Sequence, residues 1–223
     1  MQKIALVIFD CDGVLVDSEL ISAQMVVEVF SEIGLNVDLS FVYHNFVGHS
    51  FTTVAAKYAR EHGKNVPDSF ENDYRERLLN AFGGKLKAMA GIETVLDQLN
   101  VPFCLASGSS PARVNRSLEV TGLTQRFKDK IFTTSLVAKG KPAPDIFYYA
   151  AEMMGAAPNE CLVIEDSTAG VDGAKAATMT VWQFTGGVHF NHGYQHVAGP
   201  HLVDRRFNRM IDFFDPVPQL RHQ

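Results

Sequence analysis

An unbroken apolar run from Ile4 to Phe9 leads directly to two aspartates, Asp10 and Asp12, which only Cys11 separates. Such a run is typical of a strand that is buried on both faces, as in a parallel sheet covered by helices. Two carboxylates this close repel each other unless a cation lies between them or one of them is protonated. The stretch therefore indicates either a charged loop that caps the strand or a metal-assisted catalytic site.

Further short β-rich runs follow the first, and helical patterns alternate with the later ones. Strands connected by crossover helices form a mostly parallel sheet with helices on both faces. Ligands of such sheets bind beyond the carboxyl ends of the strands. Polar residues occur at three of these ends: Asp10 with Asp12, Ser107, and Glu165 with Asp166. The expected strands are 4–9, 101–106, 130–134, 161–165 and 180–184, and the expected helices are 91–100, 111–121, 144–154 and 168–177.

Residues 18–88 interrupt this alternation because they hold helical patterns and no convincing strand. Apolar residues recur at helical spacing in each pattern, and glycines follow the patterns. We therefore expect a small helical domain of residues 18–88, inserted into an α/β core domain of residues 1–17 and 89–223. The three helical patterns cover 19–33, 51–62 and 68–82, and the last ends before Gly83 and Gly84.

The composition limits the partners that the chain can have. A net charge of −5 without any basic block argues against nucleic acid or an anionic membrane as a partner. No apolar run approaches the ~20 residues of a membrane span. The three cysteines lack a CxxC spacing and are typical of buried thiols in a reducing compartment. We therefore expect a cytoplasmic protein with no membrane or nucleic-acid partner.

Four motifs, in the order DCDGVLVDSE, ASGSS, KGKPAPDIF and VIEDSTAG, resemble those of the haloacid dehalogenase superfamily. The chain is similar to its phosphatase and phosphomutase branch, which has a helical cap between the first two motifs. This resemblance covers essentially the whole chain and implies a Rossmann-like parallel-sheet core with a small α-helical cap domain. The sequence does not specify the oligomeric state, and we expect a monomer by default, because a small cap can close over the site of one chain. At one position the chain departs from the family, since Thr178 stands where a glycine usually ends the helix after the fourth motif.

The resemblance implies chemistry through an aspartyl phosphate, with Asp10 as the nucleophile and Asp12 as general acid and base. A carboxylate attacks an anionic phosphate poorly unless a divalent cation lies between them. The implied cofactor is Mg²⁺, which prefers oxygen ligands. Asp10 and Asp166 would supply carboxylates and Asp12 its backbone carbonyl. Glu165 would act either as a direct ligand or through another ligand.

Phosphate binding is implied for Ser107, Gly108 and Lys141. Pro111 suits the first position of a helix that would follow Ser107. Gly13 is expected to allow a tight turn that brings backbone N–H groups to the phosphate.

The segment 45–50 joins two predicted cap helices, and in related proteins a similar linker reaches the substrate. Asn45, His49 and Ser50 are therefore candidate specificity residues, with helix capping as the alternative. Four histidines near the C-terminus have irregular spacing in a Gly-rich segment and are expected to lie in a solvated loop rather than a metal site: His189, His192, His196 and His201.

The leading hypothesis is a Mg²⁺-dependent phosphatase of small phosphorylated metabolites, with a sugar phosphate as the expected substrate. A β-phosphoglucomutase-like phosphomutase is the main alternative, but Ser22 occupies the position where that branch has a histidine, twelve residues after the nucleophile.

A phosphonate hydrolase would need a cap lysine to form an imine, and Lys57 and Lys64 are expected on an outer face. A dehalogenase needs neither the acid nor the metal-binding carboxylates, and a non-enzymatic binding module would lack one or more catalytic residues.

Overall fold

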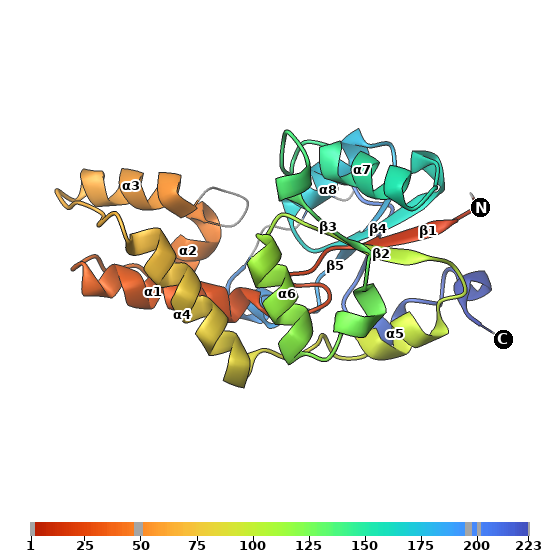
Figure 1. The fold of residues 1–223 in the computed structure, drawn as a ribbon, viewed down its shortest axis with the longest axis horizontal. Coiled ribbons are helices and arrows are strands. Elements are labelled where there is room, and N and C mark those ends of the chain that lie inside the picture. Colours follow the sequence, from red (N-terminus) through yellow and green to blue (C-terminus); the bar gives the residue numbers. More distant parts are fainter. Residues whose placement is uncertain (1–2, 47–50, 195–197, 200–201, 223) are drawn as a thin grey trace.

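The computed structural model describes residues 3–46, 51–194, 198–199 and 202–222. Within these residues, one parallel sheet runs in the order β3-β2-β1-β4-β5-β6 (Figure 1). The predicted α/β fold with a parallel sheet is therefore confirmed. The strands are β1 (Leu6–Phe9), β2 (Phe103–Ser107), β3 (Ile131–Thr133), β4 (Cys161–Glu165), β5 (Thr180–Phe184) and β6 (Arg205–Phe207).

Helices cover both faces of the sheet. In Figure 1, α7 and α8 lie on one side of the strands, and α5 and α6 lie on the other. None of the helices in the described part of the chain is long and apolar enough to cross a membrane. The helices are α1 (Glu19–Glu32), α2 (Leu39–Asn45), α3 (Phe51–Glu61), α4 (Phe70–Lys85), α5 (Ile92–Gln98), α6 (Pro111–Val120), α7 (Asp145–Met153) and α8 (Thr168–Ala176).

The first strand, β1, is central because it pairs with both β2 and β4. Its alternate side chains enter two different cores, since Val7 and Phe9 pack with one cluster and Leu6 and Ile8 with the other. All four side chains are fully buried. Complete burial of a large aliphatic or aromatic side chain contributes about 1.5–3 kcal/mol. Because the strand lies between two hydrophobic cores, none of its side chains reaches solvent, which explains the unbroken apolar run.

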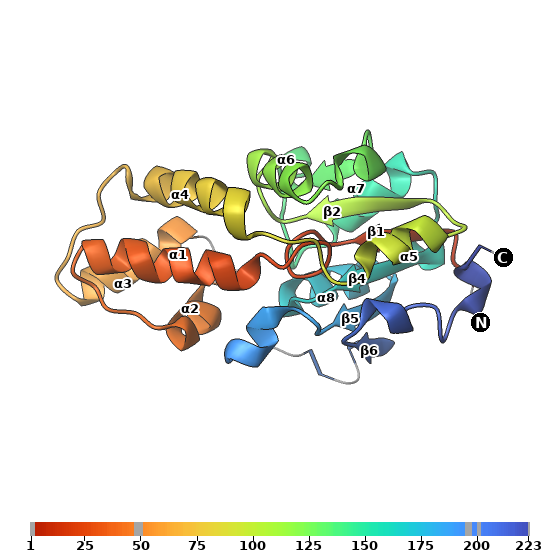
Figure 2. The ribbon, with the colours of Figure 1, turned by 90° about the horizontal axis from the view of Figure 1, so that it is seen from below.

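Helices α1 to α4 pack together beyond the carboxyl ends of the strands (Figures 1 and 2). Phe30 of α1 is fully buried and contacts the rings of Phe46, Tyr58 and Phe70. This core explains the helical spacing of the apolar residues in the segment. The helices expected at 19–33, 51–62 and 68–82 are present as α1, α3 and α4, whereas the domain boundaries at 17/18 and 88/89 remain a prediction.

Three features of the fold differ from the sequence-based expectation. Helix α4 runs through Gly83 and Gly84 to Lys85 instead of ending before them. Helix α2 was not expected, although Asp38 is its N-cap and accepts a hydrogen bond from the backbone N–H of Phe41. Strand β6 was missed because its three residues, Arg-Arg-Phe, show no strand pattern.

Helix α8 ends at a residue that is unusual for its backbone conformation. The N–H groups of Thr178 and Met179 donate to the carbonyls of Lys175 and Ala174, which is the hydrogen-bond pattern of a Schellman helix end. This pattern places Thr178 at φ 60°, in the left-handed region. Glycine is the usual residue there because an L side chain crowds the neighbouring backbone. The helix therefore ends where the family pattern predicts, but with a strained threonine.

Replacing this threonine is expected to stabilise the protein. A left-handed backbone costs an L residue roughly 1–2 kcal/mol, and the greater freedom of glycine in the unfolded chain offsets part of that gain. We predict that Thr178→Gly raises the free energy of unfolding by about 1 kcal/mol, which corresponds to about 2–4 °C in Tm. Differential scanning calorimetry measures this change.

The matched control is Asp129→Gly. Asp129 is also exposed and has φ 60°, but aspartate tolerates this region better than a β-branched residue does. Its replacement should raise Tm less than Thr178→Gly. An unchanged or lower Tm for Thr178→Gly would contradict the assignment of strain to this helix end.

Candidate active site

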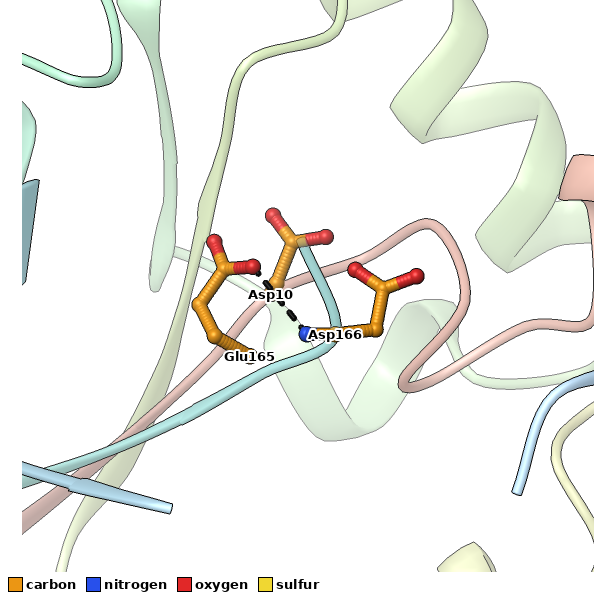
Figure 3. A group of neighbouring side chains, drawn as sticks. All are labelled: Asp10, Glu165 and Asp166. Atoms are coloured by element: carbon orange, nitrogen blue, oxygen red, sulfur yellow. Dashed lines mark hydrogen bonds between the residues drawn. The ribbon is translucent and has the colours of Figure 1, made fainter. Parts of the chain in front are cut away.

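The site lies where the strand order of the sheet reverses. Strands β1 and β4 are neighbours, and the chain continues outward from them in opposite directions along the sheet. Side chains beyond the carboxyl ends of such a pair line a crevice. Asp10 follows β1, while Glu165 ends β4 and Asp166 follows it; Figure 3 shows their carboxylates side by side. One oxygen from each lies within 4.8 Å of the others, and all three residues are buried.

Gly13 shapes the loop that follows β1. Its φ of +76° lies in the left-handed region, and a Cβ atom there would lie 1.9 Å from Oδ2 of Asp166. The glycine is therefore needed for a tight turn, as expected, and also for the close approach of Asp166. Its own N–H donates to the carbonyl of Val16. That other backbone N–H groups of this loop reach a phosphate remains a prediction.

A lysine offsets part of the negative charge of the cluster. Lys141 Nζ lies 2.6 Å from Oδ1 of Asp10 and 2.5 Å from Oε1 of Glu165, and it also donates to the carbonyl of Ala106. Burial raises the pKa of Asp10 well above its ordinary value, Lys141 opposes this rise, and the neighbouring carboxylates add to it. For Lys141, burial lowers the pKa, but Asp10 and Glu165 outweigh burial and raise it. The two carboxylates therefore favour the charged form of this lysine.

Glu165 faces the interior and not the cavity. Its Oε1 accepts from Lys141, while Oε2 accepts from the N–H groups of Asp166 and Ser167 and from the Ser167 hydroxyl. Gly170 of α8 makes room for this carboxylate, because a Cβ there would lie 1.9 Å from the Glu165 carboxyl carbon. Both oxygens of Glu165 thus have protein partners, and the residue orients Lys141.

Asp12 belongs to a separate hydrogen-bond network. Its Oδ1 accepts from Ser18 Oγ at 2.5 Å and from Nε and Nη2 of Arg113 at 3.1 and 2.8 Å. Its Oδ2 accepts from Ser109 Oγ at 2.5 Å. Burial raises the pKa of Asp12, but Arg113 and the two serine hydroxyls outweigh burial and hold it below its ordinary value. The two aspartates of the opening motif therefore have opposite environments.

The same arginine reaches the helices beyond the sheet. Nη2 of Arg113 lies 3.2 Å from Glu19 Oε1 and 2.9 Å from Ser22 Oγ, both on α1. Burial raises the pKa of Glu19 to about 7, against the opposing charge of Arg113. Arg113 thus connects α6, the loop that carries Asp12, and α1.

His189 is buried beside Asp166, so the expectation that it lies in a solvated loop is wrong. Its Nε2 lies 3.3 Å from Asp166 Oδ2, and neither ring nitrogen has a hydrogen-bond partner with good geometry among the described residues. Burial lowers the pKa of His189, but the nearby Asp166 outweighs it and raises this pKa. His192 is exposed, whereas His196 and His201 lie outside the described residues.

A cavity of about 590 Å³ opens between the strand ends and the helices α1 to α4. Asp10, Asp12 and Asp166 line it from the sheet side. Ser107, Gly108 and Lys141 line it as well, so all three expected phosphate-binding residues face the same space. The opposite wall of the cavity is formed by residues in or directly after the helices α1, α2 and α4, among them Glu19, Ser22, Tyr43, Phe46, Tyr74 and Leu78.

The architecture and motifs match known proteins. A family model described as haloacid dehalogenase-like hydrolase matches residues 4–178. The chain belongs to this family. It is 30% identical over 190 residues to the 6-phosphogluconate phosphatase of Escherichia coli (strain K12), covering 85% of this chain and 86% of that protein. The predicted family and hydrolase class are thereby confirmed.

Two solved structures of haloacid dehalogenase-like proteins superpose on nearly the whole chain. A conserved protein of this family from Agrobacterium tumefaciens str. C58 has a TM-score of 0.81 and 31% identity, covering 97% of this chain and 98% of that one. A family hydrolase from Deinococcus radiodurans R1, with bound phosphate and sodium, has a TM-score of 0.79 and 32% identity, covering 99% and 97%. The predicted family fold is confirmed.

The candidate specificity residues of this hydrolase receive no support from the described structure. Asn45 is exposed, donates to the carbonyl of Phe41 in its own helix, and does not line the cavity among the described residues. His49 and Ser50 lie outside the described residues. A role of these three residues in specificity remains a prediction.

The sequence analysis missed Arg113, Ser109, Ser18 and His189 as members of the site. A signal was available for two of them, because Ser18 lies within the first motif and Ser109 within the second. Pro111 is the first residue of α6, as the sequence predicts, and Ser110 is the N-cap of this helix. Arg113 lies in the first turn of α6, so its long side chain can reach Asp12.

Gly170 gives a direct test of the packing around Glu165. We predict that Gly170→Ala lowers the free energy of unfolding by about 1–3 kcal/mol, because the new methyl group overlaps a buried carboxylate that cannot move without losing Lys141. Thermal and denaturant unfolding measure the change. Gly84→Ala is the matched control, since that helical glycine has no atom within 4 Å of an added Cβ.

The control should be neutral or stabilising by up to about 1 kcal/mol, the usual advantage of alanine over glycine in a helix. Equal stability of Gly170→Ala and the wild type would contradict the assigned position of Glu165.

Proposed function

We propose that the protein is a Mg²⁺-dependent phosphatase of small phosphorylated metabolites that acts through an aspartyl phosphate. The observation that carries the proposal is the contrast between two aspartates facing one cavity. Asp10 lies in the carboxylate cluster beside Lys141, while Asp12 lies outside that cluster and is held by Ser18, Ser109 and Arg113. Carboxylates in different environments are suited to different roles, here nucleophile and general acid–base.

The residues at the strand ends suit a hard divalent cation. Carboxylate and carbonyl oxygens are the ligands that Mg²⁺ prefers. Asp10 and Asp166 would bind the ion through their carboxylates and Asp12 through its backbone carbonyl. Because both oxygens of Glu165 already have protein partners, its role would be to hold Lys141 and the turn after β4. When bound, the ion would reduce the repulsion between Asp10 and a phosphate and polarise the phosphoryl oxygens.

The chain's own residues would carry out two displacements in sequence. In the first, an oxygen of Asp10 attacks phosphorus, the bond to the ester oxygen breaks, and Asp12 in its protonated form gives a proton to that oxygen. In the second, Asp12 takes a proton from water, which attacks phosphorus and releases inorganic phosphate from Asp10. Lys141, Ser107 and the backbone of Gly108 would bind the phosphoryl oxygens as their charge increases.

A sugar phosphate is the substrate class that we propose. The relative from Escherichia coli is named for 6-phosphogluconate, and the structure from Deinococcus radiodurans holds phosphate. The cavity is wide enough for a small metabolite, and polar groups from α1 and α4 face it, including Glu19, Ser22 and Arg75. A small phosphorylated metabolite is therefore the proposed partner. We propose that the enzyme acts as a monomer and binds neither nucleic acid nor a membrane.

Transfer of the phosphoryl group to water is favoured over transfer to a second sugar. Ser22 occupies the position at which the phosphomutase branch has a histidine, and its hydroxyl accepts a hydrogen bond from Arg113. A serine does not take up protons near neutral pH as histidine does. Phosphonate hydrolysis is disfavoured because Lys57 and Lys64 are exposed and neither lines the cavity in the described part of the chain.

The proposal is tested by phosphate release from p-nitrophenyl phosphate and from a panel of sugar phosphates. We predict turnover with Mg²⁺, negligible turnover after treatment with EDTA, and recovery when Mg²⁺ is added back. The panel should include β-glucose 1-phosphate with a trace of the 1,6-bisphosphate, and inorganic phosphate should be the product. Full activity in chelator would contradict the metal-dependent mechanism, and glucose 6-phosphate as the main product would identify a mutase.

A further inference from the structure

Arg113 is the residue through which the acid–base aspartate is connected to the rest of the molecule. Its guanidinium donates from Nε and Nη2 to Oδ1 of Asp12, and Nη2 also contacts Glu19 and Ser22. Its side chain is only 19% exposed. The guanidinium also lies 5.8 Å from the ring centre of Phe82 on α4. A core residue is thus held by two cap helices while it binds the aspartate.

The hydrogen bonds distinguish the two oxygens of Asp12. Among the described residues, Oδ1 accepts from Ser18, from Nε of Arg113 and from Nη2 of Arg113, whereas Oδ2 accepts from the Ser109 hydroxyl. A guanidinium only donates hydrogen bonds, so a proton on Oδ1 would point at two N–H groups. A hydroxyl can donate or accept, so Ser109 tolerates a proton on Oδ2.

We propose that Arg113 is a positioning residue that fixes Oδ1 of Asp12 and leaves Oδ2 as the oxygen that carries the transferred proton. The inference rests on the proposed function and deepens it. The proton on Oδ2 passes to the ester oxygen as the phosphorus–oxygen bond breaks, and Oδ2 takes it back from the attacking water. Oδ2 is bound by the Ser109 hydroxyl, and Ser109 lines the cavity together with Ser107 and Gly108.

The cap contributes to this arrangement through two acceptors. Glu19 and Ser22 of α1 accept from Nη2 of Arg113, the same nitrogen that donates to Asp12, so Asp12 and α1 hold one side of the guanidinium together. A long arginine side chain loses considerable rotamer freedom when it is ordered, and several acceptors stabilise that ordered state. The orientation of Asp12 therefore depends on α1 being in place over the site.

The test compares two esters that differ in their need for an acid. Because kcat/KM reports the steps up to departure of the leaving group, it isolates the proton transfer from Oδ2. We predict that Arg113→Gln lowers kcat/KM for an alkyl phosphate such as glycerol 1-phosphate by about 10- to 100-fold, part of the ~10²–10⁴ that general acid–base catalysis contributes. For p-nitrophenyl phosphate, whose leaving group needs little protonation, the loss should be several times smaller.

Two further variants separate positioning from a general structural role. Arg113→Lys keeps the charge but lacks two parallel N–H groups, and it should give an intermediate loss on the alkyl ester. This variant also keeps the test valid if Arg113→Gln does not fold. In the Asp12→Asn background, Arg113→Gln should add little further loss, because a residue that acts through Asp12 has nothing left to position.

Arg116→Gln is the matched control, since Arg116 lies on the same helix, is partly exposed and pairs with Glu119 at the surface. It should leave both kcat/KM values unchanged. Equal losses on the two esters for Arg113→Gln, or additive losses with Asp12→Asn, would overturn the inference. A wild-type protein that releases phosphate from neither ester with Mg²⁺ would instead refute the proposed function.

Discussion

The buried ion pairs of Lys141 with Asp10 and Glu165 are the interaction on which the site depends. Carboxylates gathered at the ends of β1 and β4 would repel one another, and burial makes each charge more costly. Lys141 contacts two of them. Glu165 also accepts a hydrogen bond from the backbone of the turn after β4, and Gly170 leaves room for its carboxylate. Because a lysine offsets only part of this charge, the cluster is suited to a divalent cation.

The second aspartate of the motif depends on different partners. Asp12 is bound by Ser18, Ser109 and Arg113, and Arg113 is bound in turn by Glu19 and Ser22 of helix α1. Both aspartates line one cavity, and directly after Asp12 the chain turns at Gly13, which adopts a conformation that other residues rarely reach. One site therefore holds one aspartate within a cluster of carboxylates beside Lys141 and another in a hydrogen-bonded network that reaches helix α1.

The sequence predicts the parts of this arrangement that depend on local pattern. The run from Ile4 to Phe9 identifies a strand buried on both faces, and the motifs place Asp10, Ser107, Lys141, Glu165 and Asp166 around one cavity or directly behind it. Arg113 and His189 could not be placed in this way, because each contacts a residue that is distant in the sequence. Arg113 binds Asp12, about 100 residues earlier, and His189 lies beside Asp166, 23 residues earlier. Strand β6 was missed because its three residues carry two charges, and its pairing with β5 is a tertiary contact.

The central claim is that Asp10 receives the phosphoryl group and that Asp12 moves protons. Rapid-mixing kinetics of Asp12→Asn with p-nitrophenyl phosphate and Mg²⁺ test it most directly. The good leaving group should depart without an acid, while water attacks the phosphoenzyme slowly without a base. We therefore predict a burst of nitrophenolate equal to the concentration of active sites, with the phosphoryl group mapped to Asp10 by mass spectrometry after an acid quench. The absence of a burst, or a phosphoryl group on another residue, would contradict the account.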